Sequence, residues 1–374
     1  MIIGVPKEVK SSEFRVGITP SNVACLVKEA HKVVVQSSAG IGSGFSDAEY
    51  IKAGATIAQS AKELYDEAWL IVKVKEPQPS EYGFLKENHT LFCYLHLAAM
   101  PELTSVLIEK KVCAIAYETV SVDNELPLLK PMSEVAGKMS PIVAAYHLSR
   151  YQGGEGILIS GAGGVAVANV LVIGAGNAGA NAAKIATGMG ADVTIINRTM
   201  PKLEQLQKEI PDVKTLLYSH EKLGEMLKSA DIVISTVLIH GGASAPKLIT
   251  RDMLKEMKEG AVFVDIAIDQ GGTAESSKPT THTNPVFLEE GVLHYCVANM
   301  PGAYPKTSSV ALSNATISYV RKLANEGVLN AVKNDASLAL GVNIFNGAVT
   351  NRAVAETYNL EFKELEACLT SEQQ

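Results

Sequence analysis

The sequence predicts an α/β protein with two doubly wound domains. Short apolar runs alternate with helical patterns through the first 130 residues, and the same rhythm returns around a glycine-rich turn in the middle. Such alternation is typical of parallel sheets covered by helices. With 374 residues the chain is also long enough for two domains.

The N-terminal elements follow from the spacing of apolar residues. Strands are predicted at IIGVP, KVVVQ, AWLIVKVK, TLFCYLH and VCAIAYE. Helices are predicted at SNVACLVKEA, DAEYIKAG and PELTSVLIEKK. Together they predict the beginning of a parallel, doubly wound sheet.

Residues 169–199 predict a dinucleotide-binding βαβ unit. NVLVIGAGNAG reads as a strand and a glycine turn, and the helical AAKIATGMG and the strand ADVTIINRT follow. Gly174 would permit the tight turn, Gly176 would let the backbone approach a pyrophosphate, and Gly179 would let helix and strand pack closely. The turn, which also contains Ala178, therefore predicts a central Rossmann domain.

The end of the second strand of this unit does not decide between NAD and NADP. An acidic residue there bonds the ribose 2′-hydroxyl of NAD, whereas a nearby arginine can hold the 2′-phosphate of NADP. This chain has Asn197 and Arg198 at that place. Arg198 is either a cofactor contact or a solvated arginine at a strand end.

The domain boundaries follow from the elements around this unit. A long helix is expected from an N-cap at Ser133 to about Tyr151, kinked by Pro141. ADIVIST and GAVFVDIAI would extend the central sheet. The chain turns helical after Lys306 and is expected to return to the first domain, ending in a frayed tail. The domains would be 131–306 and the discontinuous 1–130 plus 307–374.

A second glycine-rich segment, Gly161–Ala166, is not expected to bind nucleotide through a helix of its own. The next strand begins near Asn169, so no room remains for a crossover helix. We interpret it as a tight loop that could lie near the cofactor.

Composition excludes several classes of protein. The net charge is −7, so nucleic acid is not an expected partner. No stretch approaches the length of an apolar membrane span, and the N-terminus has no signal-like segment. The five cysteines are scattered and contain no CxxC, so we expect neither disulfides nor a metal site, and a cytoplasmic location.

Four positions at predicted strand ends or loops could carry chemistry. Lys75, with Lys73, ends the third predicted strand, and His96 follows TLFCYL. Arg15 lies in the loop SSEFRVGITP, and Asp269 follows a buried strand in the central domain. Each also has an ordinary interpretation: a solvated lysine, a core histidine, a surface arginine or a turn-capping aspartate.

Together these residue types suit one chemistry. An anionic 2-oxo or 2-amino acid needs a guanidinium for its carboxylate. The reacting carbonyl or imine needs a nearby cation, and its proton needs a group that titrates near neutrality. Arginine, lysine and histidine could fill these three roles.

The chain resembles the alanine dehydrogenase and pyridine nucleotide transhydrogenase family over nearly its whole length. The resemblance rests on MIIGVPKE, FRVGITP, VKVKEPQPSEY, YLHLAA, AIAYETV, LPLLKPMSEVAGK, GAGNAG, APKLIT, VDIAIDQGG, VANMPGAYPKTSS and ALSNAT. It implies L-alanine, pyruvate and ammonium as substrates, NAD as cofactor with NADP possible, a discontinuous substrate domain and a cytoplasmic homo-oligomer, usually a hexamer.

The resemblance also implies roles for matching positions. Arg15 would bind the substrate carboxylate, Lys75 would polarise the carbonyl, His96 would be the general acid and base, and Asp269 would complete the set beside the nicotinamide. Further cofactor contacts are implied at Ser133, Lys202, Ser219, Leu238, Ile266, Lys278, Asn299 and Met300.

Two other functions stay open, and three departures limit the resemblance. The same scaffold could serve another amino acid, or a non-enzymatic nucleotide-binding subunit, although the latter would not need Arg15, Lys75 and His96 together. The departures are Asn197–Arg198, the loop GAGGV where the family usually has a proline-containing turn, and HGGASAPK, which is one residue longer and lacks a lysine in its loop. The last two could alter cofactor contacts.

Overall fold

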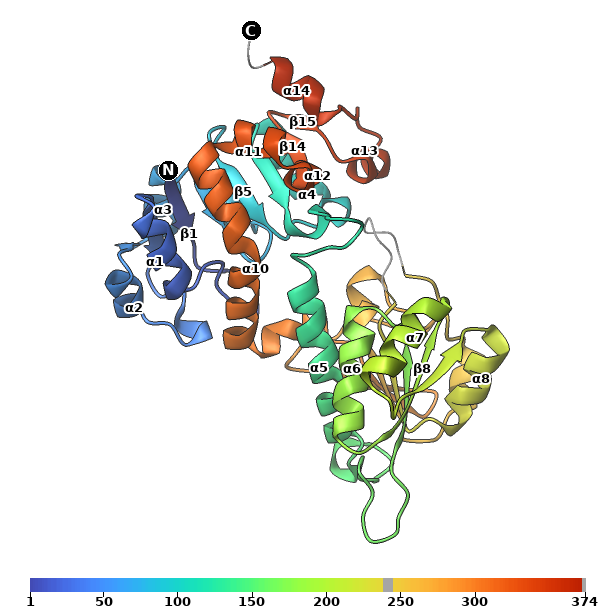
Figure 1. The fold of residues 1–374 in the computed structure, drawn as a ribbon. Helices are drawn as coiled ribbons and strands as arrows, with labels where there is room; N and C mark the ends of the chain where they lie inside the picture. The colour runs from blue at the N-terminus through green and yellow to red at the C-terminus, as the bar shows by residue number, and fades with distance from the viewer. Residues whose placement is uncertain (238–244, 372–374) are drawn as a thin grey trace. The chain divides into compact units, whose positions relative to one another are not determined.

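The computed structural model describes residues 1–237 and 245–371. The chain divides into two compact units, each with a β-sheet of its own (Figure 1). Unit 1 comprises Met1–Met132 and Tyr304–Gln374, and unit 2 comprises Ser133–Ala303. Within the described residues, no helix is both long and apolar enough to cross a membrane.

The sheet of unit 1 has the strand order β15-β14-β6-β5-β4-β1-β2-β3 in the described residues. Its strands are β1 (Ile2–Val5), β2 (Lys32–Gln36), β3 (Thr56–Ala58), β4 (Leu70–Val72), β5 (Thr90–Cys93), β6 (Cys113–Ala116), β14 (Val342–Phe345) and β15 (Ala348–Val349). The strands from β6 to β3 pair in parallel. After β3 the chain returns to the other side of β1, so the order of strands reverses between β1 and β4.

Helices accompany this sheet on both faces. They are α1 (Pro20–Lys28), α2 (Asp47–Lys52), α3 (Ala61–Glu67), α4 (Pro101–Glu109), α10 (Pro305–Glu326), α11 (Val328–Asn334), α12 (Ala336–Gly341), α13 (Arg352–Tyr358) and α14 (Leu365–Ser371). Phe92 of β5 lies in the core cluster on one face, and Leu91 and Cys93 lie in the cluster on the other. Burial on both faces explains why these strands are continuous apolar runs.

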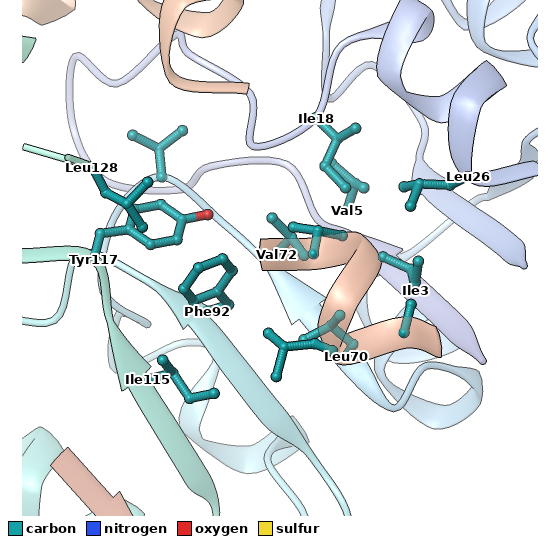
Figure 2. Packing of buried hydrophobic residues seen from close by; sticks show 14 of the residues in the cluster. Ile3, Val5, Ile18, Leu26, Leu70, Val72, Phe92, Ile115, Tyr117 and Leu128 are labelled. Carbon is teal, nitrogen blue, oxygen red and sulfur yellow. The ribbon is translucent and has the colours of Figure 1, made fainter. Parts of the chain in front are cut away.

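Figure 2 shows the core cluster that contains Phe92. Two aromatic rings pack against each other in it. The rings of Phe92 and Tyr117 meet edge to face, with centroids 4.5 Å apart. Ile3, Val5 and Val72 from the neighbouring strands complete the layer in the same view. The core therefore holds the ends of β1, β4 and β5 in fixed positions.

Unit 2 has the strand order β12-β13-β11-β10-β7-β8-β9. Its strands are β7 (Asn169–Ile173), β8 (Asp192–Asn197), β9 (Lys214–Leu217), β10 (Ile232–Ser235), β11 (Val262–Asp265), β12 (Val286–Glu289) and β13 (Val292–Tyr295). Its helices are α6 (Asn177–Gly188), α7 (Met200–Glu209), α8 (His220–Ser229) and α9 (Arg251–Lys255), and α5 (Lys130–His147) leads into it. Among the described strands of unit 2, only β12 pairs antiparallel. The remaining order is that of a Rossmann sheet, with α6 and α7 packed against β8 (Figure 1).

The structure corrects the expected start and end of the long helix. Ser133 is not its N-cap, because α5 already begins at Lys130 and places Pro131 in the first turn, where a proline is tolerated. The helix ends at His147 rather than Tyr151, and a short 3₁₀ turn, Arg150–Gln152, follows. Pro141 lies inside α5 as expected.

The predicted helices after Lys306 are confirmed by α10, α11 and α12, and a hairpin that was not predicted follows them. β14 and β15 form an antiparallel hairpin, and β14 also pairs antiparallel with β6. Asn346 and Gly347 form its two-residue turn with φ of 52° and 82°, and Asn-Gly is a strong hairpin signal that the prediction overlooked. The expected frayed tail is also wrong as far as Ser371, because α14 is helical and buries Leu369.

Gly161–Ala166 is a tight loop, as predicted, closed by a bridge between Ala162 and Val165. It precedes β7 and lies beside the start of β8, since a Cβ on Gly190 would be 3.4 Å from the Cβ of Ser160. The glycine turn follows the opposite end of β7. The loop and the glycine turn therefore lie at opposite ends of β7, and the expectation that the loop could lie near the cofactor stays a prediction.

Candidate active site

Three candidate residues follow strands that end at one edge of the unit 1 sheet. Arg15 follows β1, Lys75 follows β4 and His96 follows β5, and these strands are parallel neighbours. The segment carrying Arg15 lies against the end of β4, because a Cβ on Gly17 would be 2.6 Å from the carbonyl oxygen of Val72. The strand order reverses at β1 and β4, which is where open α/β sheets bind ligands.

Arg15 is buried and held by Glu13. Its Nε donates to Glu13 Oε1 at 2.7 Å and its Nη2 to Oε2 at 2.6 Å. Burial lowers the pKa of Arg15, but the hydrogen bonds and charge of Glu13 outweigh it and raise the pKa above its ordinary value. Nη1 lies 3.1 Å from the sulfur of Met132, a weak acceptor. Arg15 is therefore not a surface arginine.

Lys73 and Lys75 are both buried, so the alternative of solvated lysines is wrong for each. Lys73 Nζ lies 2.7 Å from Glu81 Oε1 and 3.4 Å from Glu8 Oε2. Burial lowers the pKa of Lys73, but the two carboxylates raise it above its ordinary value, so Lys73 is a structural cation. Glu8 Oε1 also accepts from the amides of Val74 and Lys75, at 2.7 and 3.4 Å, which fixes the backbone beneath Lys75.

His96 stands in a left-handed backbone conformation, with φ 50° and ψ 40°. Non-glycine residues adopt this conformation at a cost, and it is common at functional sites. Glu118 stabilises the turn by accepting from the amide of His96 at 2.6 Å and from that of Leu95 at 3.2 Å. His96 Nδ1 lies 3.8 Å from the same carboxylate, and 42% of the side chain is exposed. The alternative of a core histidine is wrong.

Tyr94 connects the three candidates. Its ring stacks on His96 with centroids 6.1 Å apart, and its amide donates to the carbonyl of Val74, beside Lys75. Burial raises the pKa of Tyr94, and the nearby charge of Arg15 lowers it in part. Its hydroxyl donates to the carbonyl of Leu128 at 2.6 Å, so the ring is fixed at both ends.

Asp269 lies in unit 2, exposed on the 3₁₀ turn Ile266–Gln270 that follows β11. Asp265 organises this turn by accepting from the amides of Ala267 and Thr273 and from the hydroxyl of Ser277. Burial raises the pKa of Asp265, although these hydrogen bonds oppose the shift. The structure thus presents Asp269 at the carboxyl edge of the unit 2 sheet.

The glycine turn has the steric properties that its sequence predicts. Gly174 has φ of 101°, and a Cβ on Gly179 would lie 1.8 Å from the carbonyl oxygen of Gly174. A Cβ on Gly176 would meet no heavy atom within 4 Å, so the space above it is open. Gly176 is the N-cap of α6 without any side-chain cap, which leaves the first amides of the helix for a ligand.

The other candidate cofactor contacts belong to unit 2 and differ in their surroundings. Ser133 lies one helical turn before Gly137, where α5 touches Ala178. Ser219 caps α8, and Lys278 lies over the ring of Phe287 and near Glu289. The remaining positions are Asn197 at the end of β8, the exposed Arg198 and Lys202, Ile266 at the start of the Asp269 turn, and Asn299 and Met300 after β13. Leu238 and most of HGGASAPK lie outside the described residues.

Sequence reasoning missed the carboxylates that support the candidates. Glu13 holds Arg15, Glu8 supports Lys75, Glu118 supports His96, and Asp265 shapes the turn of Asp269. Glu8, Glu118 and Asp265 lie in segments that the resemblance already quoted, and Glu13 directly precedes FRVGITP. The sequence could have indicated such a supporting carboxylate where an acidic residue stands inside an otherwise apolar segment, as Glu118 does in AIAYETV.

Comparison with known proteins matches both parts of the chain to one family. Residues 4–136 match the "Alanine dehydrogenase/PNT, N-terminal domain" model and residues 140–352 the corresponding C-terminal domain model. An alanine dehydrogenase of Staphylococcus epidermidis is 50% identical over 372 residues, which cover 99% of this chain and all of that protein.

Solved structures agree with the sequence matches. A structure of an L-alanine dehydrogenase has a TM-score of 0.93 and 44% identity, covering 96% of this chain and 99% of its own. A transhydrogenase from Sinorhizobium meliloti has a TM-score of 0.81 and 27% identity, covering 94% and 100%. The chain belongs to the alanine dehydrogenase/PNT family.

Proposed function

We propose that this chain is an L-alanine dehydrogenase, which catalyses the reversible oxidative deamination of L-alanine to pyruvate and ammonia. The observation that carries the proposal is the meeting of Arg15, Lys75 and His96 at one sheet edge, tied together by Tyr94. A protein that only carried nucleotides would not need this set. The alanine dehydrogenases similar to this chain over nearly its full length support the choice of substrate.

Unit 2 is the proposed site of a nicotinamide dinucleotide, with NAD as the expectation from the family resemblance. The open space above Gly176 and the uncapped amides of α6 fit a pyrophosphate. When bound, the nicotinamide supplies the acceptor for the hydride that leaves the α-carbon. Asp269 is proposed to act beside it, and no metal is needed because Lys75 supplies the positive charge.

Each residue of unit 1 then has a defined role. Arg15, fixed by Glu13, holds the substrate carboxylate through its guanidinium. Loss of hydride leaves an imine at the α-carbon. His96 takes a proton from the attacking water and returns one to the departing nitrogen, so ammonia leaves as the C–N bond breaks. Lys75 stabilises negative charge on the oxygen that becomes the pyruvate carbonyl.

A panel of amino acids tests the proposal. Formation of reduced cofactor would be followed with L-alanine, glycine, L-serine and L-valine at pH about 9–10, where a deprotonated amine favours deamination. L-alanine should give the highest kcat/KM. A higher value for another amino acid would reassign the substrate, and no reduction with any of them would favour the nucleotide-carrier alternative.

We also propose a homo-oligomer, expected to be a hexamer, in the cytoplasm. Several large apolar side chains of unit 2 are exposed: Ile142, Tyr146, Tyr151, Leu158 and Val165. Ile142 and Tyr146 are four residues apart and share one face of α5, as a subunit contact would require. Light scattering of the purified protein would give the mass, and a monomer would contradict this part of the proposal.

A further inference from the structure

The carboxyl end of β8 is the place where an acidic residue favours NAD and a nearby arginine favours NADP. In this chain the side-chain amide of Asn197 organises that strand end. Asn197 Oδ1 accepts from the amide of Ala175 in the glycine turn at 3.2 Å. A backbone amide can only donate, so the other end of the carboxamide, Nδ2, must face Thr199. Nδ2 donates to the hydroxyl of Thr199 at 3.0 Å and to its carbonyl at 3.1 Å.

An aspartate would not fit the same place. Its second oxygen would face the carbonyl oxygen of Thr199 without a hydrogen between them, and the two would repel. Asn197 is therefore more than a neutral substitute for the usual acid. The local backbone depends on a donor at this position, and the strand end carries no carboxylate that would repel a phosphate.

The charge around this strand end is positive. Arg198 is exposed, and no residue in the described ranges 1–237 and 245–371 forms an ion pair or hydrogen bond with its side chain. Lys202 is exposed in the first turn of α7, which contains no acidic residue. The acid of β8, Asp192, pairs with Lys214 at the other end of the strand.

Thr199 supplies a further donor. It is the N-cap of α7, yet its side chain caps no amide of that helix. Because its hydroxyl oxygen accepts from Asn197, its hydrogen is available to donate to a ligand. Arg198 and Thr199 thus offer the kind of donors that a 2′-phosphate requires, next to the turn proposed for the pyrophosphate.

We infer that Asn197, Arg198 and Thr199 form a site for the 2′-phosphate of the dinucleotide, so that this chain prefers NADP(H) to NAD(H). The inference rests on the proposed binding of a dinucleotide at Gly174–Gly179, and it names which dinucleotide. It does not depend on the amino acid that is oxidised.

Direct binding of NADPH and NADH to the full chain, followed by nucleotide fluorescence, tests the inference apart from turnover. The unmodified protein should bind NADPH more tightly, and its NADPH affinity should fall more steeply with ionic strength. Arg198→Met should weaken NADPH binding about ten- to hundredfold and leave NADH nearly unchanged. Lys208→Met, an exposed cation in the last turn of the same helix, is the matched control and should change neither.

The outcomes separate this inference from the proposed function. Tighter binding of NADH by the unmodified protein, or an equal loss for both nucleotides in Arg198→Met, would overturn it. A preference for NADPH without oxidation of L-alanine would uphold the 2′-phosphate site and refute the proposed reaction. Asn197→Asp would place a carboxylate beside the proposed 2′-phosphate and opposite the carbonyl of Thr199, so it should weaken NADPH binding more than NADH binding.

Discussion

Glu13 and Arg15 form a two-point ion pair with almost no solvent exposure, through contacts of 2.7 and 2.6 Å. The pair fixes the plane of the guanidinium before any substrate arrives. It also sets the cost of changing either partner, because a buried charge without its counter-ion is strongly unfavourable.

Glu13→Gln should therefore affect both folding and substrate binding. We expect the free energy of unfolding to fall by about 3–5 kcal/mol, since Arg15 stays buried after losing the carboxylate of Glu13. We also expect a higher KM for pyruvate with a smaller change in kcat, because Arg15 would lose its orientation. Urea unfolding and steady-state kinetics would measure these effects. Glu364→Gln, which removes an exposed pair with Arg352, is the control and should change neither quantity.

His96 should be needed for turnover and not for folding. His96→Asn keeps a residue that tolerates the left-handed conformation and removes the proton-transferring ring. Its kcat should fall about 10²- to 10⁴-fold, while its unfolding midpoint and cofactor binding stay near those of the unmodified protein. Near-normal turnover would show that His96 is not the general base.

Glu118 should matter through its hold on His96. Glu118→Ala leaves the amides of Leu95 and His96 without their acceptor, whereas Glu118→Gln keeps one acceptor oxygen. We therefore expect a lower kcat for the alanine variant and a milder loss for the glutamine variant. Equal kcat values for both would contradict a positioning role by way of these amides.

Residue patterns could predict much of this protein, but not the partners of its charged groups. Alternating strands and helices gave the two sheets, and strand ends gave Arg15, Lys75 and His96 as candidates. Periodicity cannot say that Glu13 folds back on Arg15 or that Lys73 is enclosed by Glu8 and Glu81, because these contacts depend on loop paths. The start of α5 was misplaced since Pro131 was interpreted as a boundary, although a proline also fits a first helical turn.

Buried histidines should make the protein less stable in mild acid. Burial lowers the pKa values of His89, His147 and His294 below the ordinary 6.5. The unfolded chain then binds protons below pH 6.5 that the folded chain resists. The stability that the three neutral histidines contribute is fully present above pH 6.5. It is lost as the pH falls through their lowered pKa values in the folded chain.

His294 offers the clearest test of this dependence. Its ring lies between the hydroxyl of Ser276 at 2.7 Å and the carbonyl of Val292 at 2.9 Å. His294→Gln should lose less stability between pH about 8 and about 5.5 than the unmodified protein, as measured by urea unfolding at each pH. The raised pKa of Glu8 acts in the opposite direction but equally in both proteins, so it cancels. His220→Gln, at an exposed ring, should keep the original pH dependence.

Gly176 and Gly179 should respond in opposite ways to the same added methyl group. In Gly179→Ala the Cβ would collide with the carbonyl of Gly174, so α6 must move away from the turn, and we expect a loss of about 1–3 kcal/mol in stability. In Gly176→Ala the Cβ would meet no protein atom within 4 Å, so stability should hardly change. The methyl group would nevertheless occupy the space proposed for the pyrophosphate, so cofactor affinity should fall. Thermal unfolding and nucleotide fluorescence, applied to both variants, separate the two effects. Full cofactor affinity in Gly176→Ala would place the pyrophosphate elsewhere in unit 2.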